Sequence, residues 1–116
     1  MAVASRNREL LYALRPWILM SWFHNVHGYA QLAHDLIEGR PITATSEELT
    51  TLATRVKTLR DLYAKEYALQ EEFITEGIRE LAGVDLAQAQ RRNLEWQKDM
   101  GVVLLRIDAE LRRRGT

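Results

Sequence analysis

Apolar residues in the first third of the chain recur at steps of three and four, the spacing that places side chains on one face of an α-helix. This periodic run extends from Ser5 to Glu38, and Pro16 lies inside it, where a proline removes one backbone donor and clashes with the preceding turn. The pattern predicts a long first helix that is either kinked at Pro16 or split there into two pieces. Its apolar face consists of Leu11, Leu14, Ile18, Trp22, Val26, Tyr29, Ala33 and Leu36.

A second periodic segment predicts a helix from Ser46 to about Ala82. Gly39 and Pro41 mark the loop before it, and Thr45 with Glu48 has the spacing of a capping box. The apolar positions of its first half alternate three and four apart, as in a coiled-coil seam. They are Leu49, Leu52, Val56, Leu59 and Tyr63.

The seam of this second helix falters after Tyr63. If it continued unchanged, Glu66 and Gln70 would point into the core. A shift of phase by one residue instead turns apolar side chains inward, and it corresponds to a stutter that locally unwinds the supercoil. We therefore expect a stutter, with the core continued by Tyr67, Ile74, Ile78 and Leu81.

A third helix is predicted from Leu86 to about Arg114, with Asp85 as its N-cap. Short loops between long helices are typical of antiparallel neighbours. The predicted fold is therefore all-α, an antiparallel up-down-up bundle of three long helices in one domain that spans residues 1–116. The main apolar face of the third helix consists of Ala89, Trp96, Met100, Val103, Leu104, Ile107 and Leu111.

Composition narrows the possible classes of protein. The chain has 116 residues, 47% of them hydrophobic and 28% charged, which is ordinary usage for one globular domain. It contains no cysteine, so disulfides, thiolate metal sites and cysteine nucleophiles are excluded. No apolar run is long enough to span a bilayer, and no signal peptide is visible. We expect a cytoplasmic protein with no membrane partner.

Two helices carry apolar residues on a second side. Trp17 and Met20 lie opposite the main face of the first helix, and Leu94, Val102 and Leu105 point away from that of the third. A helix that is apolar on two sides is normally covered on both. Our leading hypothesis is therefore a non-enzymatic interaction protein without a cofactor. It would self-associate, most simply as a dimer, or dock on a protein partner.

The histidines provide an alternative hypothesis. His24 and His27 are three residues apart on a predicted helix, so both could contact one metal ion. Glu66, where the seam falters, could supply a carboxylate from the second helix. His34 lies about 10 Å further along the axis, and the Glu-x-x-His pattern of di-metal bundles is absent. The alternatives are a small metal-binding protein or enzyme, and histidines that serve only as solvated boundary residues.

Arginines at the end of the chain suggest a third possibility. Arg112, Arg113 and Arg114 could contact a nucleic-acid backbone, as in an accessory subunit of a nucleic-acid complex. The formal net charge of the chain is zero, with sixteen basic and sixteen acidic residues, which favours a solvated surface and compensation of the helix dipole instead. No glycine-rich phosphate-binding motif is present.

Overall fold

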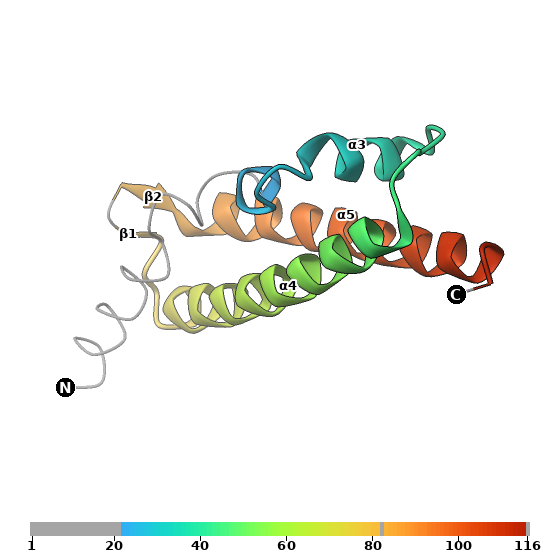
Figure 1. Ribbon diagram of the computed structural model, residues 1–116. Coiled ribbons are helices and arrows are strands. Elements are labelled where there is room, and N and C mark those ends of the chain that lie inside the picture. The colour runs from blue at the N-terminus through green and yellow to red at the C-terminus, as the bar shows by residue number, and fades with distance from the viewer. Residues whose placement is uncertain (1–21, 82, 116) are drawn as a thin grey trace.

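The computed structural model describes residues 22–81 and 83–115, and these residues are mostly helical (Figure 1), so the all-α class is confirmed. Two strands of two residues each form the remaining regular structure of this part of the chain. The elements in chain order are η1 (Trp22–Asn25), α3 (Ala30–Glu38), α4 (Ser46–Thr75), β1 (Glu80–Leu81), β2 (Val84–Asp85) and α5 (Leu86–Arg113).

Helices α4 and α5 form a long antiparallel hairpin that is the frame of the molecule (Figure 1). Side-chain hydrogen bonds give its register. Asn93 of α5 donates to the Tyr63 carbonyl at 2.9 Å, and Arg114 lies within 3.3 Å of the Ser46 hydroxyl. Residue numbers therefore rise on one helix as they fall on the other. The resulting rod measures 53 × 21 × 21 Å.

The first helix differs from the prediction. Residues 22–38 form the short 3-10 helix η1, a turn and the nine-residue α3, rather than one continuous helix. His27 and Gly28 have φ angles of 44° and 92°, which an α-helix does not accommodate. The expected long helix through Glu38 is therefore wrong, and the described residues contain two long helices instead of three. The kink or split expected at Pro16 lies outside the described residues.

Two arginines hold the ends of α3 against the hairpin. Arg55 of α4 donates to the carbonyls of Val26 and His27 at 3.0 and 3.1 Å, and its guanidinium lies 5.1 Å from the centroid of the Tyr29 ring. Arg106 of α5 donates to the carbonyls of Leu36 and Ile37 at the other end of the helix. These bonds add donors to carbonyls that lie at the helix break and at the helix end, where backbone partners are fewer.

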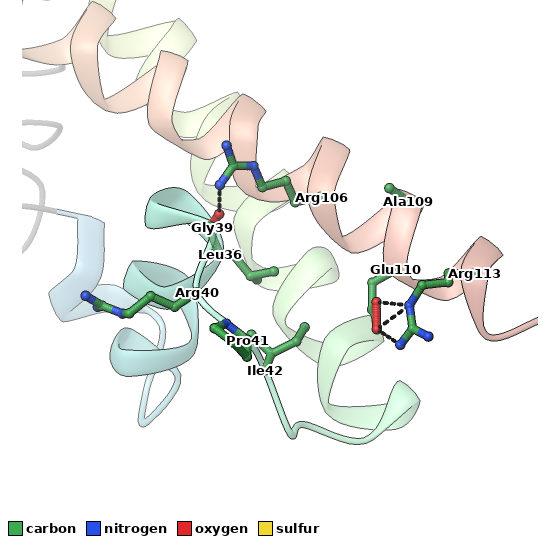
Figure 2. A pocket seen from close by; sticks show the side chains of 9 residues that line it. All are labelled: Leu36, Gly39, Arg40, Pro41, Ile42, Arg106, Ala109, Glu110 and Arg113. Atoms are coloured by element: carbon green, nitrogen blue, oxygen red, sulfur yellow. Dashed lines mark hydrogen bonds and ion pairs between the residues drawn. The ribbon is translucent and has the colours of Figure 1, made fainter.

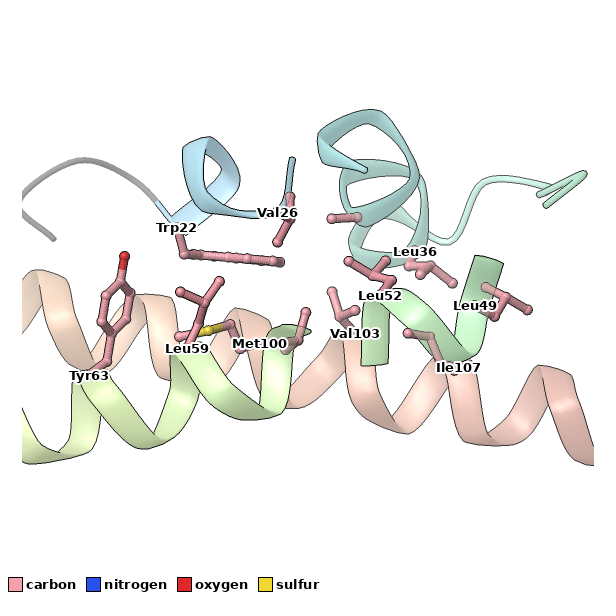
Figure 3. Packing of buried hydrophobic residues seen from close by; sticks show 12 residues of the cluster. Trp22, Val26, Leu36, Leu49, Leu52, Leu59, Tyr63, Met100, Val103 and Ile107 are labelled. Carbon is pink, nitrogen blue, oxygen red and sulfur yellow. The ribbon is translucent and has the colours of Figure 1, made fainter. Parts of the chain in front are cut away.

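The main core lies between η1, α3 and the first half of the hairpin (Figure 3). The side chain of Trp22 lies over Leu59 and Met100, whereas Leu36 lies near Leu49 and Ile107 at the other end. The apolar periodicities of all three segments predicted this core correctly. Its fully buried members include Trp22, Val26, Ala33, Leu49, Leu52, Val56, Tyr63, Met100 and Val103.

The expected stutter in α4 is wrong, because the seam continues without a phase shift. Glu66, Gln70 and Phe73 are buried at the positions that follow Tyr63 in alternating steps of three and four. The polar side chains become acceptable because they bind one another, with Gln70 Nε2 donating to Glu66 Oε1 at 3.0 Å. This polar layer separates the main core from a smaller one around Phe73 and Leu86.

The ends of α4 and α5 follow from their capping residues. The Thr45–Glu48 capping box is confirmed by both of its hydrogen bonds, at 2.9 and 3.1 Å. Helix α4 ends at Thr75 and not near Ala82, because Gly77 adopts a φ of 89° and the Ile78 amide bonds back to the Phe73 carbonyl at 2.9 Å.

The start of α5 is confirmed at Leu86. The Asp85 carboxylate accepts from the Gln88 amide at 3.1 Å, as an N-cap does. Before it, β1 and β2 pair in an antiparallel manner, with Glu80 opposite Asp85. The sequence pattern did not predict these strands, because segments of two residues are too short to show a period.

Candidate functional site

The outer surface of α5 carries the large apolar side chains that are most exposed among the described residues. Leu105 is 73% exposed and Leu94 is 49% exposed. Val102, which the sequence placed with them, is only half-buried. The other predicted contact residues, Trp17 and Met20, lie outside the described part of the chain.

Leu94 and Leu105 belong to a continuous row along α5. They are eleven residues apart, so at 100° per residue they point within about 20° of each other and lie about 16 Å apart along the axis. The row follows the alternating steps of four and three that a helix uses to contact another helix. We call it the outer strip, and it consists of Ala87, Arg91, Leu94, Lys98, Gly101, Leu105, Asp108 and Arg112.

A groove of about 420 Å³ runs beside the outer strip, between α5 and α4. Its apolar lining includes Ala53, Gly101, Leu104 and Leu105. Since Gly101 and Leu105 point about 100–140° away from Arg106, the groove opens on a different side of α5 from the one that binds α3. One side of the hairpin is thus covered by α3, and another presents a groove bordered by exposed leucines.

The polar layer at the far end of the main core contains an unusual carboxyl group. Glu66 is 4% exposed, and burial raises the pKa of its carboxyl to about 8, while hydrogen bonds from Asn93 and Gln70 oppose that rise. Burial also raises the pKa of the neighbouring Tyr63 to about 12. The stutter expected from the sequence would turn Glu66 outward, although the unbroken spacing of three and four residues was the signal that it points inward.

The predicted metal ligands are not gathered into one site in the described residues. His27 is exposed at the turn before α3, whereas Glu66 is buried in the polar layer and accepts from Gln70. No group of three or more potential ligands occurs within residues 22–81 and 83–115. The side chain of His24 lies outside what the structure describes, so the metal hypothesis stays a prediction.

The arginines at the end of α5 form ion pairs within their own helix. Arg112 binds Asp108 at 3.1 Å, and Arg114 binds Glu110 at 3.3 Å. Arg113 also binds Glu110, as Figure 2 shows, and its hydrogen bonds hold the pKa of that carboxyl down at about 2. Two carboxylates thus offset part of the positive charge of the three arginines, and the nucleic-acid hypothesis stays a prediction.

A cavity of about 460 Å³ lies between the end of α3, the following loop and α5 (Figure 2). Three arginines line it, but each one is engaged. Arg40 pairs with Asp35 and Glu38, Arg106 binds the α3 carbonyls, and Arg113 is held by Glu110. The cavity therefore has few arginine N–H groups that could bind an anion, because most of them already bind protein atoms.

Comparisons with known proteins add no assignment. No family model, curated protein or solved structure matches this chain. In the part of the chain that the structure describes, no helix has the length and apolar character that crossing a bilayer requires. The function of this chain is therefore inferred from the geometry of the outer strip and of the polar layer.

Proposed function

We propose that this protein is a non-enzymatic helical assembly protein that pairs with a second copy of itself through the outer strip of α5. The observation that carries the proposal is the exposure of Leu94 and Leu105 on one face of a rigid 28-residue helix. Burying a leucine stabilises an interface by roughly 1.5–3 kcal/mol, so two leucines contributed by each copy provide a substantial driving force.

The order of residues in the outer strip favours a second copy over an unrelated partner. An antiparallel pairing of two α5 helices about a two-fold axis between Asp99 and Met100 places Leu94 against Leu105 of the partner subunit. The same register places Arg91 against Asp108 of the partner subunit, and Lys98 against Gly101 of the partner subunit. Apolar side chains thus meet apolar ones and opposite charges meet, which is the self-complementarity that a two-fold interface requires.

Gly101 lies near the centre of this pairing, opposite Lys98 of the partner subunit. The nearest atoms to a Cβ built on Gly101 belong to the Arg60 guanidinium of α4, the closest at 3.5 Å. The Arg60 side chain therefore lies over α5 at this residue, and it would have to move aside for the backbone of a second copy to approach here. In this register, the groove beside the strip would take up Leu94 of the partner subunit or the stem of its Lys98.

Sedimentation velocity from micromolar to millimolar concentration tests the proposal. The wild-type protein should shift from monomer to dimer, and the double substitution Leu94→Glu with Leu105→Glu should raise the dimer Kd by more than about a hundredfold. Ala68→Glu is a matched control, because it adds a carboxylate at an exposed position of α4 away from the strip. A wild-type monomer at every concentration, or a double variant that dimerises normally, would refute the proposal.

A further inference from the structure

A second cavity lies at the end of the hairpin near β1 and β2. Its volume is about 280 Å³, and its lining comes from four elements. Glu66 is contributed by α4, Glu80 by β1, Asp85 by β2, and Arg92 and Trp96 by α5. A concave site built from several elements, with an aromatic wall and converging polar groups, is typical of small-molecule binding sites.

One oxygen of the Glu66 carboxyl is buried beside this cavity without a partner at hydrogen-bond distance. Its Oε1 accepts from Gln70 at 3.0 Å, whereas its Oε2 is buried and makes no hydrogen bond. Buried polar atoms in folded proteins are nearly always bonded, because an unbonded one loses its hydration without compensation. The free oxygen therefore calls for a donor that enters from the cavity.

The charge of the residues that line the cavity indicates which kind of ligand would bind there. Three carboxyl groups, from Glu66, Glu80 and Asp85, and one guanidinium, from Arg92, line the cavity. Because burial raises the pKa of Glu66 to about 8, the negative charge of the lining comes from the other two carboxylates. The Asp85 carboxylate also caps α5, where its Oδ1 accepts from the Gln88 amide. The indole of Trp96, whose ring centroid lies 5.7 Å from that of Tyr63, is half-buried and forms part of the wall. Negative groups beside an aromatic face are the features that bind organic cations.

We propose that this cavity binds a small organic cation with a primary alkylammonium group. When the ammonium binds, the Glu66 carboxyl releases its proton to solvent and its Oε2 accepts from the ammonium, which Glu80 and Asp85 also attract. The alkyl chain lies along Trp96 and Ala89, where its removal from water adds to binding. Such a group occurs on free amines and on lysine side chains of polypeptides, and the cavity is of a size for either.

This site is independent of the proposed dimer contact. Trp96 and Arg92 lie more than about 100° around α5 from Leu94, at 100° per residue. Failure of self-association would therefore leave the cavity unchanged, and an empty cavity would leave the outer strip unchanged. The two proposals can be tested on the same protein and fail separately.

An NMR titration of the whole chain with n-butylammonium is the direct test. Saturable shifts are expected at the Trp96 indole and at the backbone amides of residues 83–92, and n-butanol, which lacks the charge, should produce none. Nα-acetyl-lysine methylamide, added separately, shows whether a lysyl side chain binds as well as the free amine. If both compounds bind equally well, the ligand can be a lysine side chain of a polypeptide. If only n-butylammonium binds, the ligand is a free amine.

Two variants test the assigned contacts. Glu66→Gln and Trp96→Leu should each weaken n-butylammonium binding by at least about tenfold, while Glu47→Gln, an exposed change on the first turn of α4, should not alter it. Trp96→Leu keeps the test valid if Glu66→Gln does not fold, because Trp96 is only half-buried. The absence of saturable shifts in the wild-type protein, or binding that survives in a folded variant, would overturn the proposal.

Discussion

Glu66 is the residue whose environment departs most from its ordinary chemistry. It faces Gln70 one turn along α4 and Asn93 across from it on α5, and Tyr63 precedes it on the same side of the helix. Removal from water dominates over these hydrogen bonds, so the neutral acid is favoured in the folded protein. A carboxyl group that stays protonated near neutral pH makes stability depend on pH in a direction opposite to that of ordinary acidic side chains.

The first prediction concerns this pH dependence. The pKa of Glu66 is about 8 in the folded protein and near 4.5 in the unfolded chain, so the folded state binds one more proton between these values. The contribution of Glu66 to stability is therefore complete below pH 4.5, falls as pH rises and is lost above pH 8. Chemical denaturation between pH 5 and 9 should show a loss on the order of 3 kcal/mol from this group.

Glu66→Gln separates this effect from other titrations. The variant should lack most of the decline, whereas Glu47→Gln should follow the wild-type curve. The carboxyl groups of Asp35, Glu48 and Glu110 have lowered pKa values, so they stay ionised throughout this range and do not confuse the result. Parallel curves for the wild type and Glu66→Gln would contradict the assignment.

At the scale of elements, α3 depends on the hairpin for its stability. An isolated helix of nine residues is marginal in water, because nucleation is costly and few bonds form. Its buried face, Ala33 and Leu36, packs into the main core. Arg55 of α4 binds carbonyls of the turn before it, and Arg106 of α5 binds carbonyls of its last turn. The element therefore forms where tertiary contacts complete it.

The second prediction tests the arginine at the end of α3. Arg106→Met keeps the aliphatic stem but removes the hydrogen bonds to Leu36 and Ile37, at an expected cost of about 1–2 kcal/mol. Hydrogen exchange should quicken at the amides of α3 and remain unchanged in the middle of α4. Arg112→Met, an exposed change on the same helix, is the control and should leave α3 protected. Uniform quickening in all helices would show that α3 does not open by itself.

The third prediction tests the cap of α4. Thr45→Ala removes the hydroxyl that accepts from the Glu48 amide, and the free energy of unfolding should fall by about 1 kcal/mol. Thermal denaturation measures the change, with Thr58→Ala as a control in the middle of the helix, where the hydroxyl only bonds back to the Thr54 carbonyl. A larger effect from Thr58→Ala than from Thr45→Ala would contradict the role of the cap.

At the scale of the whole molecule, the hairpin is unevenly covered. Helix α3 and η1 lie along the half of the rod that contains the main core (Figure 1), and the polar layer and the second cavity lie beyond it. The outer strip runs along α5 on a side that faces away from α3, and its leucines are exposed. One long helix thus serves as core, as wall of a cavity and as the proposed contact with a second copy.

The fourth prediction tests the register of the proposed dimer. Arg91→Asp and Asp108→Arg should each weaken dimerisation, because like charges would then meet across the two-fold axis. The double variant restores opposite charges and should recover most of the dimer at low salt, as measured by sedimentation equilibrium. The pair is exposed, so the recovery should diminish at high salt. If the double variant loses as much dimer affinity as the two single variants lose together, this register is excluded.

Local spacing in the sequence was sufficient to predict the two long helices. The capping residues Thr45 and Asp85 mark their starts, and the apolar steps of three and four identify the faces that form the core. These features depend on interactions between residues close in the chain, so they can be inferred without knowing the partners of each helix.

Three features were not predicted from the sequence, and two of them depend on contacts between distant segments. The break at His27 is stabilised by Arg55, which comes 28 residues later, and the inward position of Glu66 relies on Asn93 of the opposite helix. The short strands exist because Gly77 ends α4 and the chain must return to α5. A polar group is acceptable in a core only when a partner reaches it, and that partner is determined by the tertiary structure.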